Sequence, residues 1–206
     1  LAKMLGEVHE TYMEIEDLPA LEKWVEESSE LSNQALADAI REKESVALKK
    51  ALSWSVKVNE KINDLPFDVK KPFAGVKEAL ATAHEKADIA IVSSANLQAV
   101  EEEWELYGLL KHVDILLAQD TGSKAFCIGE LVKKGYNVRN VLMTGDAPGD
   151  YEAASKNGVF FYPILVRHEN ESWEEFRNEG ALRLFDGSYE GAYQEKKIAE
   201  FMDNLK

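Results

Sequence analysis

Apolar residues recur at every third or fourth position over residues 1 to about 63, where glycine is almost absent. This spacing predicts three or four helices and no strand, because it gathers the apolar side chains on one helix face. The clearest such stretch runs from Leu18 to Ala47. Residues 63–66 end the last helix with a proline, and residues 71–75 form an irregular joint. We therefore expect a small all-helical domain over residues 1–70.

Beyond the joint, short apolar runs alternate with helical segments. The predicted strands are Ile89–Ser93, Val113–Ala118, Val138–Thr144 and Val159–Val166. The predicted helices are Val76–Lys86, Leu97–Leu110, Lys124–Lys134, Gly149–Asn157 and two more within Trp173–Lys206. This alternation predicts an α/β fold in which residues 71–206 form a three-layer, doubly wound parallel sheet with helices on both faces. Ligands in such sheets bind at the carboxyl ends of the strands.

Charge and cysteine content narrow the classes of partner. The chain has 206 residues, 45% of them apolar, enough to bury one core and a smaller module. Asp and Glu number 38 against 24 Lys and Arg, and the formal charge of −14 repels nucleic acid and anionic membranes. No run approaches the ~18 to 20 apolar residues that cross a bilayer. A single cysteine, Cys127, excludes an internal disulfide. We expect a cytoplasmic protein that binds neither nucleic acid nor membranes.

Two carboxylates follow the third predicted strand. Asp146 lies at the strand end, and Asp150 enters the next helix after an Ala-Pro-Gly turn. Because the two residues flank one turn, their carboxylates can converge on one spot, where hard oxygen ligands suit Mg²⁺. Gly-Asp and Pro-Gly-Asp are also common in turns and at helix N-caps, so a purely structural role is the alternative.

Hydroxyl and ammonium groups follow the first two predicted strands. Ser93, Ser94 and Ala95 lie where the first strand gives way to a helix, so the Ser93 hydroxyl and the backbone N–H groups can bind an anion. Lys124 begins the helix after the second strand. Helix dipoles favour cations at the opposite end, so we expect an anionic group beside Lys124. The alternatives are an N-cap serine and a solvated lysine.

The order of these residues resembles the motifs of the haloacid dehalogenase (HAD) superfamily. In that family a Ser or Thr follows an apolar strand, a Lys comes next, and an acidic pair such as Gly-Asp-x-x-x-Asp closes the series. Ser93, Lys124, and the pair of Asp146 and Asp150 match these three motifs. The resemblance covers about residues 70–170 and implies a Rossmann-like core.

The resemblance also implies a helical cap, and one motif of the family is absent. Residues 1–70 look like the inserted cap, and residues 72–76 look like its return to the core. The first motif, Asp-x-Asp on the opening strand, should precede the cap, but no Asp-x-Asp occurs in this sequence. Residues 184–188 are only superficially similar, because Leu184 takes one aspartate position and the segment follows the sheet. We expect either a fragment of a longer protein, which the start at Leu1 without methionine favours, or a degenerate relative.

The resemblance implies that the protein is a Mg²⁺-dependent phosphohydrolase. It would act on a small phosphorylated metabolite through an aspartyl-phosphate intermediate. The aspartates of the missing motif would attack phosphorus and move protons. This chain would supply Asp146 as a direct Mg²⁺ ligand, Asp150 as the second acidic metal partner, and Ser93 with Lys124 to hold phosphoryl oxygens. We expect no turnover from the chain as it stands, and a monomer.

Two alternatives come from other functional classes. The missing aspartates are also typical of a non-catalytic HAD-like protein that binds or regulates. A receiver-type phosphoacceptor domain shares a parallel sheet, an acidic pair and a lysine, but its acidic pair comes early and its lysine late, the reverse of the order here. Signatures of dinucleotide-binding, P-loop, zinc-protease and serine-hydrolase sites are absent from the sequence.

Overall fold

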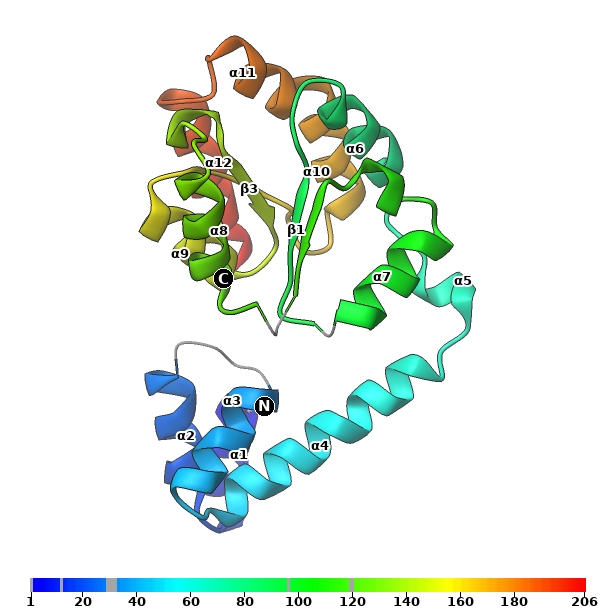
Figure 1. Cartoon of the computed structure of the whole chain (residues 1–206). Helices are drawn as coiled ribbons and strands as arrows, with labels where there is room; N and C mark the ends of the chain where they lie inside the picture. The colour runs from blue at the N-terminus through cyan, green and yellow to red at the C-terminus, as the bar shows by residue number, and fades with distance from the viewer. Residues whose placement is uncertain (1, 12, 29–32, 96, 119–120) are drawn as a thin grey trace. The chain divides into compact units, whose positions relative to one another are not determined.

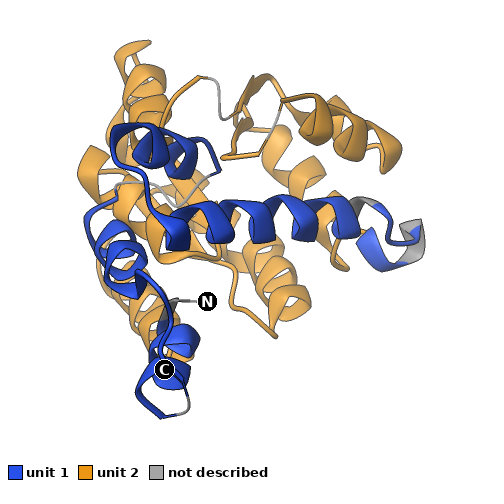
Figure 2. Cartoon of the chain, turned by 90° about the horizontal axis from the view of Figure 1, so that it is seen from below, with its two compact units in different colours: residues 1–70 blue, residues 71–206 orange. Residues whose placement is uncertain are grey.

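The structure of the chain, a computed structural model, describes residues 2–11, 13–28, 33–95, 97–118 and 121–206. It divides into two compact units, Leu1–Lys70 and Lys71–Lys206, which are coloured separately in Figure 2. None of the described helices is long and apolar enough to cross a bilayer. The interpretation of the first unit as a cap and the second as the catalytic core stays a prediction.

The first unit is helical, as its apolar spacing predicts. It contains α1 (Ala2–Thr11), α2 (Leu18–Glu27), α3 (Asn33–Glu42), α4 (Val46–Asn63) and the short α5 (Phe67–Lys70) (Figure 1). The stretch from Leu18 to Ala47 is divided between α2, α3 and the start of α4, because polar residues interrupt it. Ser28 is extended, and Ser45 caps α4 by accepting the Leu48 amide hydrogen at 3.2 Å.

The core of the first unit lies between α2, α3 and α4. Its buried members are Leu18, Leu21, Leu36, Ala47, Leu48 and Ala51. A polar contact joins the starts of two of these helices, because the Ser45 hydroxyl donates to the carboxylate of Asp17. Asp17 precedes α2 in the left-handed conformation, with φ of 60°. The same serine thus caps α4 and holds the turn that starts α2.

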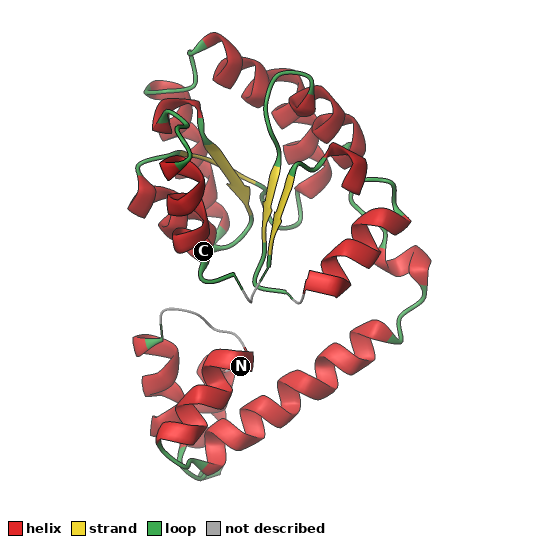
Figure 3. Ribbon diagram, viewed as in Figure 1, coloured by secondary structure: helices red, strands yellow, loops and turns green. Residues whose placement is uncertain are grey.

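The second unit alternates short strands with helices (Figure 3). The strands are β1 (Ala90–Val92), β2 (Ile115–Leu117), β3 (Leu142–Gly145) and β4 (Phe160–Pro163). The α-helices are α6 (Val76–His84), α7 (Leu97–Leu106), α8 (Lys124–Lys133), α9 (Pro148–Asn157), α10 (Glu169–Glu175), α11 (Ala181–Asp186) and α12 (Ala192–Asn204). Short 3-10 turns, η1 (Leu110–His112) and η2 (Val138–Asn140), precede β2 and β3, and a π-helical turn, η3 (Phe176–Gly180), joins α10 to α11. Three of these strands lie within the predicted apolar runs, and β3 extends one residue beyond its run, to Gly145.

The strands pair in parallel, as the alternation predicts, but they form two small sheets. β1 pairs with β2, with Ile91 opposite Leu116, and β3 pairs with β4, with Met143 opposite Phe161. No strand ladder joins these pairs in the part of the chain that the structure describes. The α/β character is therefore present, whereas one continuous sheet is not formed by the described residues.

Helices cover both faces of the β3–β4 pair because successive β4 side chains point in opposite directions. Phe160 and Tyr162 enter a cluster with residues of α6, η3 and α11. Phe161 enters a second cluster with residues of α8, α9 and α12. All four residues of β4 are buried, as expected for a parallel strand between two helical layers.

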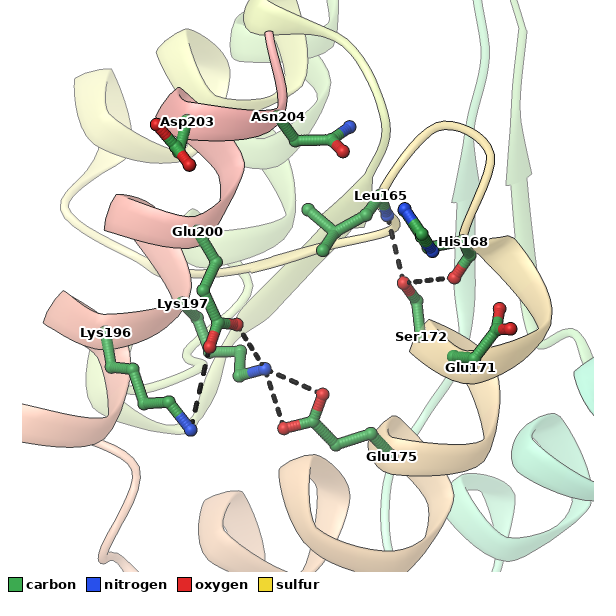
Figure 4. Close-up of a pocket in the computed structure, with 10 residues that line it drawn as sticks. All are labelled: Leu165, His168, Glu171, Ser172, Glu175, Lys196, Lys197, Glu200, Asp203 and Asn204. Atoms are coloured by element: carbon green, nitrogen blue, oxygen red, sulfur yellow. Dashed lines mark hydrogen bonds and ion pairs between the residues drawn. The ribbon is translucent and has the colours of Figure 1, made fainter.

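A buried lysine ties α12 to α10 (Figure 4). The Lys197 side chain is 4% exposed, and its ammonium group lies 2.7 Å from a carboxylate oxygen of Glu175 and 2.6 Å from one of Glu200. Burial lowers the pKa of Lys197, but hydrogen bonds and charge from the two glutamates outweigh this effect, so its pKa lies above the usual value. The ion cluster therefore holds the C-terminal helix α12 against α10.

Replacing Lys197 by methionine should lower the free energy of unfolding by about 2 kcal/mol, because two neighbouring carboxylates would lose their shared cation. This value is below that of a fully buried pair, since each glutamate side chain keeps 35% of its surface exposed. The matched control is Lys196→Met, because Lys196 is 65% exposed and lies 3.6 Å from Glu200. Urea denaturation should show a change of less than ~0.5 kcal/mol for the control. Equal losses in both variants would contradict the structural role of Lys197.

Three tyrosines in the same region should titrate only when the protein unfolds. Burial raises the pKa of Tyr162, Tyr189 and Tyr193 far above the usual value, and the charge of Glu175 adds to each shift. Above a pH of about 10 the unfolded phenols release protons and the folded ones do not, so stability falls as the pH rises. Phenolate absorbance from these residues should therefore appear together with loss of the circular dichroism signal. Complete tyrosine ionisation in a protein with native circular dichroism would show that this burial is wrong.

Candidate functional site

Ser93 directly follows β1 and extends its ladder, because its amide donates to the Leu117 carbonyl at 2.9 Å. Its hydroxyl accepts the amide hydrogen of Ala95 at 3.1 Å, and it is half-buried, whereas Ser94 and Ala95 are exposed. Since α7 begins at Leu97, Ser93 lies too far upstream to be the N-cap of that helix. The serine hydroxyl therefore lies in a turn at the carboxyl end of β1.

Lys124 is the first residue of α8, and Ser123 caps this helix by accepting the Phe126 amide hydrogen. The anionic group expected beside Lys124 is Asp150, whose Oδ1 lies 2.5 Å from the lysine Nζ. The Asp150 side chain is 3% exposed and that of Lys124 is 28% exposed. This ion pair joins the first turns of α8 and α9.

Both carboxylate oxygens of Asp150 are engaged. Oδ1 binds Lys124, and Oδ2 accepts the amide hydrogen of Ala147 at 3.1 Å, which closes the turn between β3 and α9. Gly145, the last residue of β3, makes room for this carboxylate, because a Cβ at that position would overlap the Asp150 side chain. The glycine and the aspartate of this turn are thus mutually dependent.

Asp146 has the opposite environment, because it is exposed directly after β3. Its carboxylate makes no ion pair within residues that the structure describes, so it can receive a ligand. Mg²⁺ commonly binds one or two carboxylates and completes its shell with water and phosphate oxygens. The donor chemistry of Asp146 fits that role, whereas Asp150 is already held by Lys124. No group of three or more metal-binding side chains is found among the described residues, and Asp150 as a direct ligand stays a prediction.

The structure brings two of the four predicted site residues into direct contact. Lys124 and Asp150 form the ion pair. Ser93 and Asp146 lie at the carboxyl ends of β1 and β3, and neither makes a described hydrogen bond or ion pair to Lys124 or Asp150. Sequence reasoning missed the role of Gly145. The available signal was the Gly-Asp-x-x-x-Asp pattern, in which the glycine lies five positions before the second, buried aspartate.

One pocket lies away from these residues, between the start of α10 and α12 (Figure 4). It has a volume of about 500 Å³, and its lining residues are Leu165, His168, Glu171, Ser172, Glu175, Lys196, Lys197, Glu200, Asp203 and Asn204. In this pocket the buried ammonium group of Lys197 is bound by Glu175 and Glu200. The Ser172 hydroxyl donates to the His168 carbonyl at 2.8 Å. The central polar groups bind one another, so fewer of them are available to a ligand than at the strand ends.

Replacing Gly145 by alanine should displace the Asp150 carboxylate and lower the free energy of unfolding by about 1–3 kcal/mol. The matched control is Gly149→Ala in the same turn, because a Cβ there meets no atom within 4 Å. Thermal unfolding of both variants tests this difference, and the control should lose no stability, since alanine favours a helix more than glycine. A Gly145→Ala protein as stable as the control would show that the carboxylate is not confined as described.

Comparison with known proteins adds one finding. Residues 7–164 match the family described as haloacid dehalogenase-like hydrolase, and this match spans both units of the structure. No curated protein and no solved structure matches the chain significantly.

Proposed function

Because the chain belongs to the haloacid dehalogenase-like hydrolases, we propose that its protein is a Mg²⁺-dependent phosphohydrolase. The substrate is a small phosphorylated metabolite, and the reaction passes through an aspartyl-phosphate on an Asp-x-Asp segment that this sequence does not contain. The residues of this chain then hold the phosphoryl group and its charge, which is most of what catalysis of phosphoryl transfer requires.

The ion pair of Lys124 and Asp150 carries this proposal. A buried carboxylate holds the ammonium group at the first turn of α8, and one of the three ammonium hydrogens is used in that contact. The lysine side chain is 28% exposed, so its other hydrogens can reach a ligand. A fixed cation of this kind gives an anionic substrate a local binding point in a protein whose formal charge is −14.

Ser93 and Asp146 complete the proposed site from the ends of β1 and β3. The Ser93 hydroxyl and the backbone N–H group of Ser94 donate to phosphoryl oxygens. The Ala95 N–H group joins them by exchanging its bond to the Ser93 hydroxyl for one to a phosphoryl oxygen. The exposed carboxylate of Asp146 holds Mg²⁺, with Asp150 as the second acidic group in the same turn. When bound, Mg²⁺ would neutralise negative charge on the phosphoryl group. Residues 1–70, as a helical cap, would exclude water and select the metabolite.

Replacing Lys124 by alanine should reduce turnover by roughly 10²- to 10³-fold in protein that carries the Asp-x-Asp segment, because one donor to the transferred phosphoryl group is lost. The control is Lys133→Ala at the other end of α8, where the lysine is 73% exposed and pairs with Glu130. Release of inorganic phosphate from a panel of phosphomonoesters, with and without Mg²⁺, measures both variants. Circular dichroism should show that both remain folded.

Two results would contradict the proposed function. Unchanged turnover in the Lys124→Ala variant would remove the lysine from the site. The absence of Mg²⁺-dependent phosphate release from every ester, in folded protein with both aspartates, would favour a binding or regulatory role.

A further inference from the structure

Asn157 is the last residue of α9, and its side-chain amide reaches across to α8. The amide nitrogen lies 2.9 Å from the carbonyl oxygen of Ala125 and 2.9 Å from that of Ala153. A side-chain amide carries two hydrogens, so each of them can serve one carbonyl. The bond to Ala153 fixes the side chain on its own helix, and the bond to Ala125 joins the two helices.

Gly129 makes room for this amide on the facing side of α8. The helices α8 and α9 pack directly against each other (Figure 1). A Cβ at position 129 would lie 3.0 Å from Asn157 Oδ1, so a larger residue would push the amide away. Glycine inside a helix is unfavourable relative to alanine, and the close approach of Asn157 gives a local reason for its presence here.

The bond between the helices ends one residue from Lys124. Ala125 directly follows Lys124, and both residues lie in the first turn of α8. The amides of a first helical turn lack partners within the helix, so such a turn depends on outside contacts. Ser123 provides one contact by accepting the Phe126 amide hydrogen, but this serine is exposed. Asn157 provides a second contact, which comes from a neighbouring helix.

Lys124 is thus attached to α9 at two points. Asp150, in the first turn of α9, binds the lysine ammonium group, and Asn157, at the end of α9, binds the backbone beside the lysine. The lysine stem is flexible, so a contact to the ammonium group alone leaves the backbone free to shift. A contact to the backbone alone leaves the ammonium group free to rotate. The two contacts together confine both ends of the lysine.

We propose that Asn157 is a positioning residue, which holds the first turn of α8 so that Lys124 points its ammonium group at the transferred phosphoryl group. This inference rests on the proposed function, because it assigns Asn157 a part in the same site. Asn157 acts only through Lys124 and does not touch the substrate. In the competing interpretation, the amide merely stabilises the packing of α8 on α9 and leaves the lysine unaffected.

The first test measures turnover in protein that carries the Asp-x-Asp segment, as phosphate release from a phosphomonoester that it hydrolyses. Asn157→Ala should reduce turnover roughly tenfold, because a small displacement of a donor is costly in catalysis. In the Lys124→Ala background the same substitution should cause no further loss, since a positioning residue acts through the group it positions. Losses that multiply in the double variant would contradict the proposal.

A second substitution disturbs the same contact from α8. Gly129→Ala crowds the Asn157 amide and should lower turnover, whereas in the Asn157→Ala background the shorter side chain leaves room for the new methyl group. Asn157→Asp keeps the size of the side chain but turns acceptors toward two carbonyls. It should therefore reduce turnover at least as much as Asn157→Ala does.

Asn204 supplies a control of the same kind away from the site. It is the last residue of α12, and its amide donates to the Val166 carbonyl at 3.3 Å. Asn204→Ala removes a comparable bond at a helix end and should leave turnover unchanged. Circular dichroism should show that all variants are folded under the assay conditions. Equal losses of turnover in Asn204→Ala and Asn157→Ala would assign both to general stability and overturn the proposal.

The second test needs no turnover and uses the chain as it stands. Lysine amines are labelled sparsely with acetic anhydride, and mass spectrometry compares Lys124 with Lys133, which is 73% exposed at the other end of α8. In Asn157→Ala the labelling of Lys124 should rise severalfold relative to Lys133, because its ammonium group is less confined against Asp150. Unchanged labelling of Lys124 would overturn the proposal whatever the activity. Increased labelling in a protein that hydrolyses no ester would support the placement of Lys124 by Asn157 and contradict the phosphohydrolase function.

Discussion

The carboxylate of Asp150 is held from two sides, by the ammonium group of Lys124 and by the amide of Ala147. A charge that is almost fully buried is tolerated only with such partners, so these contacts determine the local geometry. They lock the first turns of α8 and α9 together, they require glycine at position 145, and they leave Asp146 on the exposed side of the same turn. The candidate site is therefore organised around a charge that solvent scarcely reaches.

Two lysines in this protein illustrate how the number of carboxylate partners separates a binding group from a structural one. Lys197 is bound by Glu175 and Glu200 and is 4% exposed, so its hydrogens are largely committed within the fold. Lys124 has one carboxylate partner and is 28% exposed, so it keeps hydrogens for an anion. In a chain with a formal charge of −14, a lysine that is fixed but not fully neutralised suits the phosphate binding that we propose for it.

The two strand pairs and the site are connected through strand direction. β1 and β3 end in Ser93 and Asp146, and both strands are parallel members of one α/β layer. A parallel layer with helices on both faces brings the ends of its strands to one edge, where loops carry polar groups that the buried strands cannot. The same strand direction places the candidate residues Ser93 and Asp146 after the carboxyl ends of β1 and β3.

The sequence by itself determined the local structure and the candidate residues of this protein. Apolar spacing predicted the helices of the first unit and all four strands of the second, because burial of one face is a local property of a segment. Motif order predicted the family, since Ser93 and Lys124 precede the aspartates along the chain. Only the tertiary structure decided which charges and edges meet: that Lys124 binds Asp150, that Lys197 binds Glu175, and that β1 and β3 do not pair. These contacts join segments far apart in the chain, and local periodicity carries no information about which distant partner a buried charge or a strand edge will find.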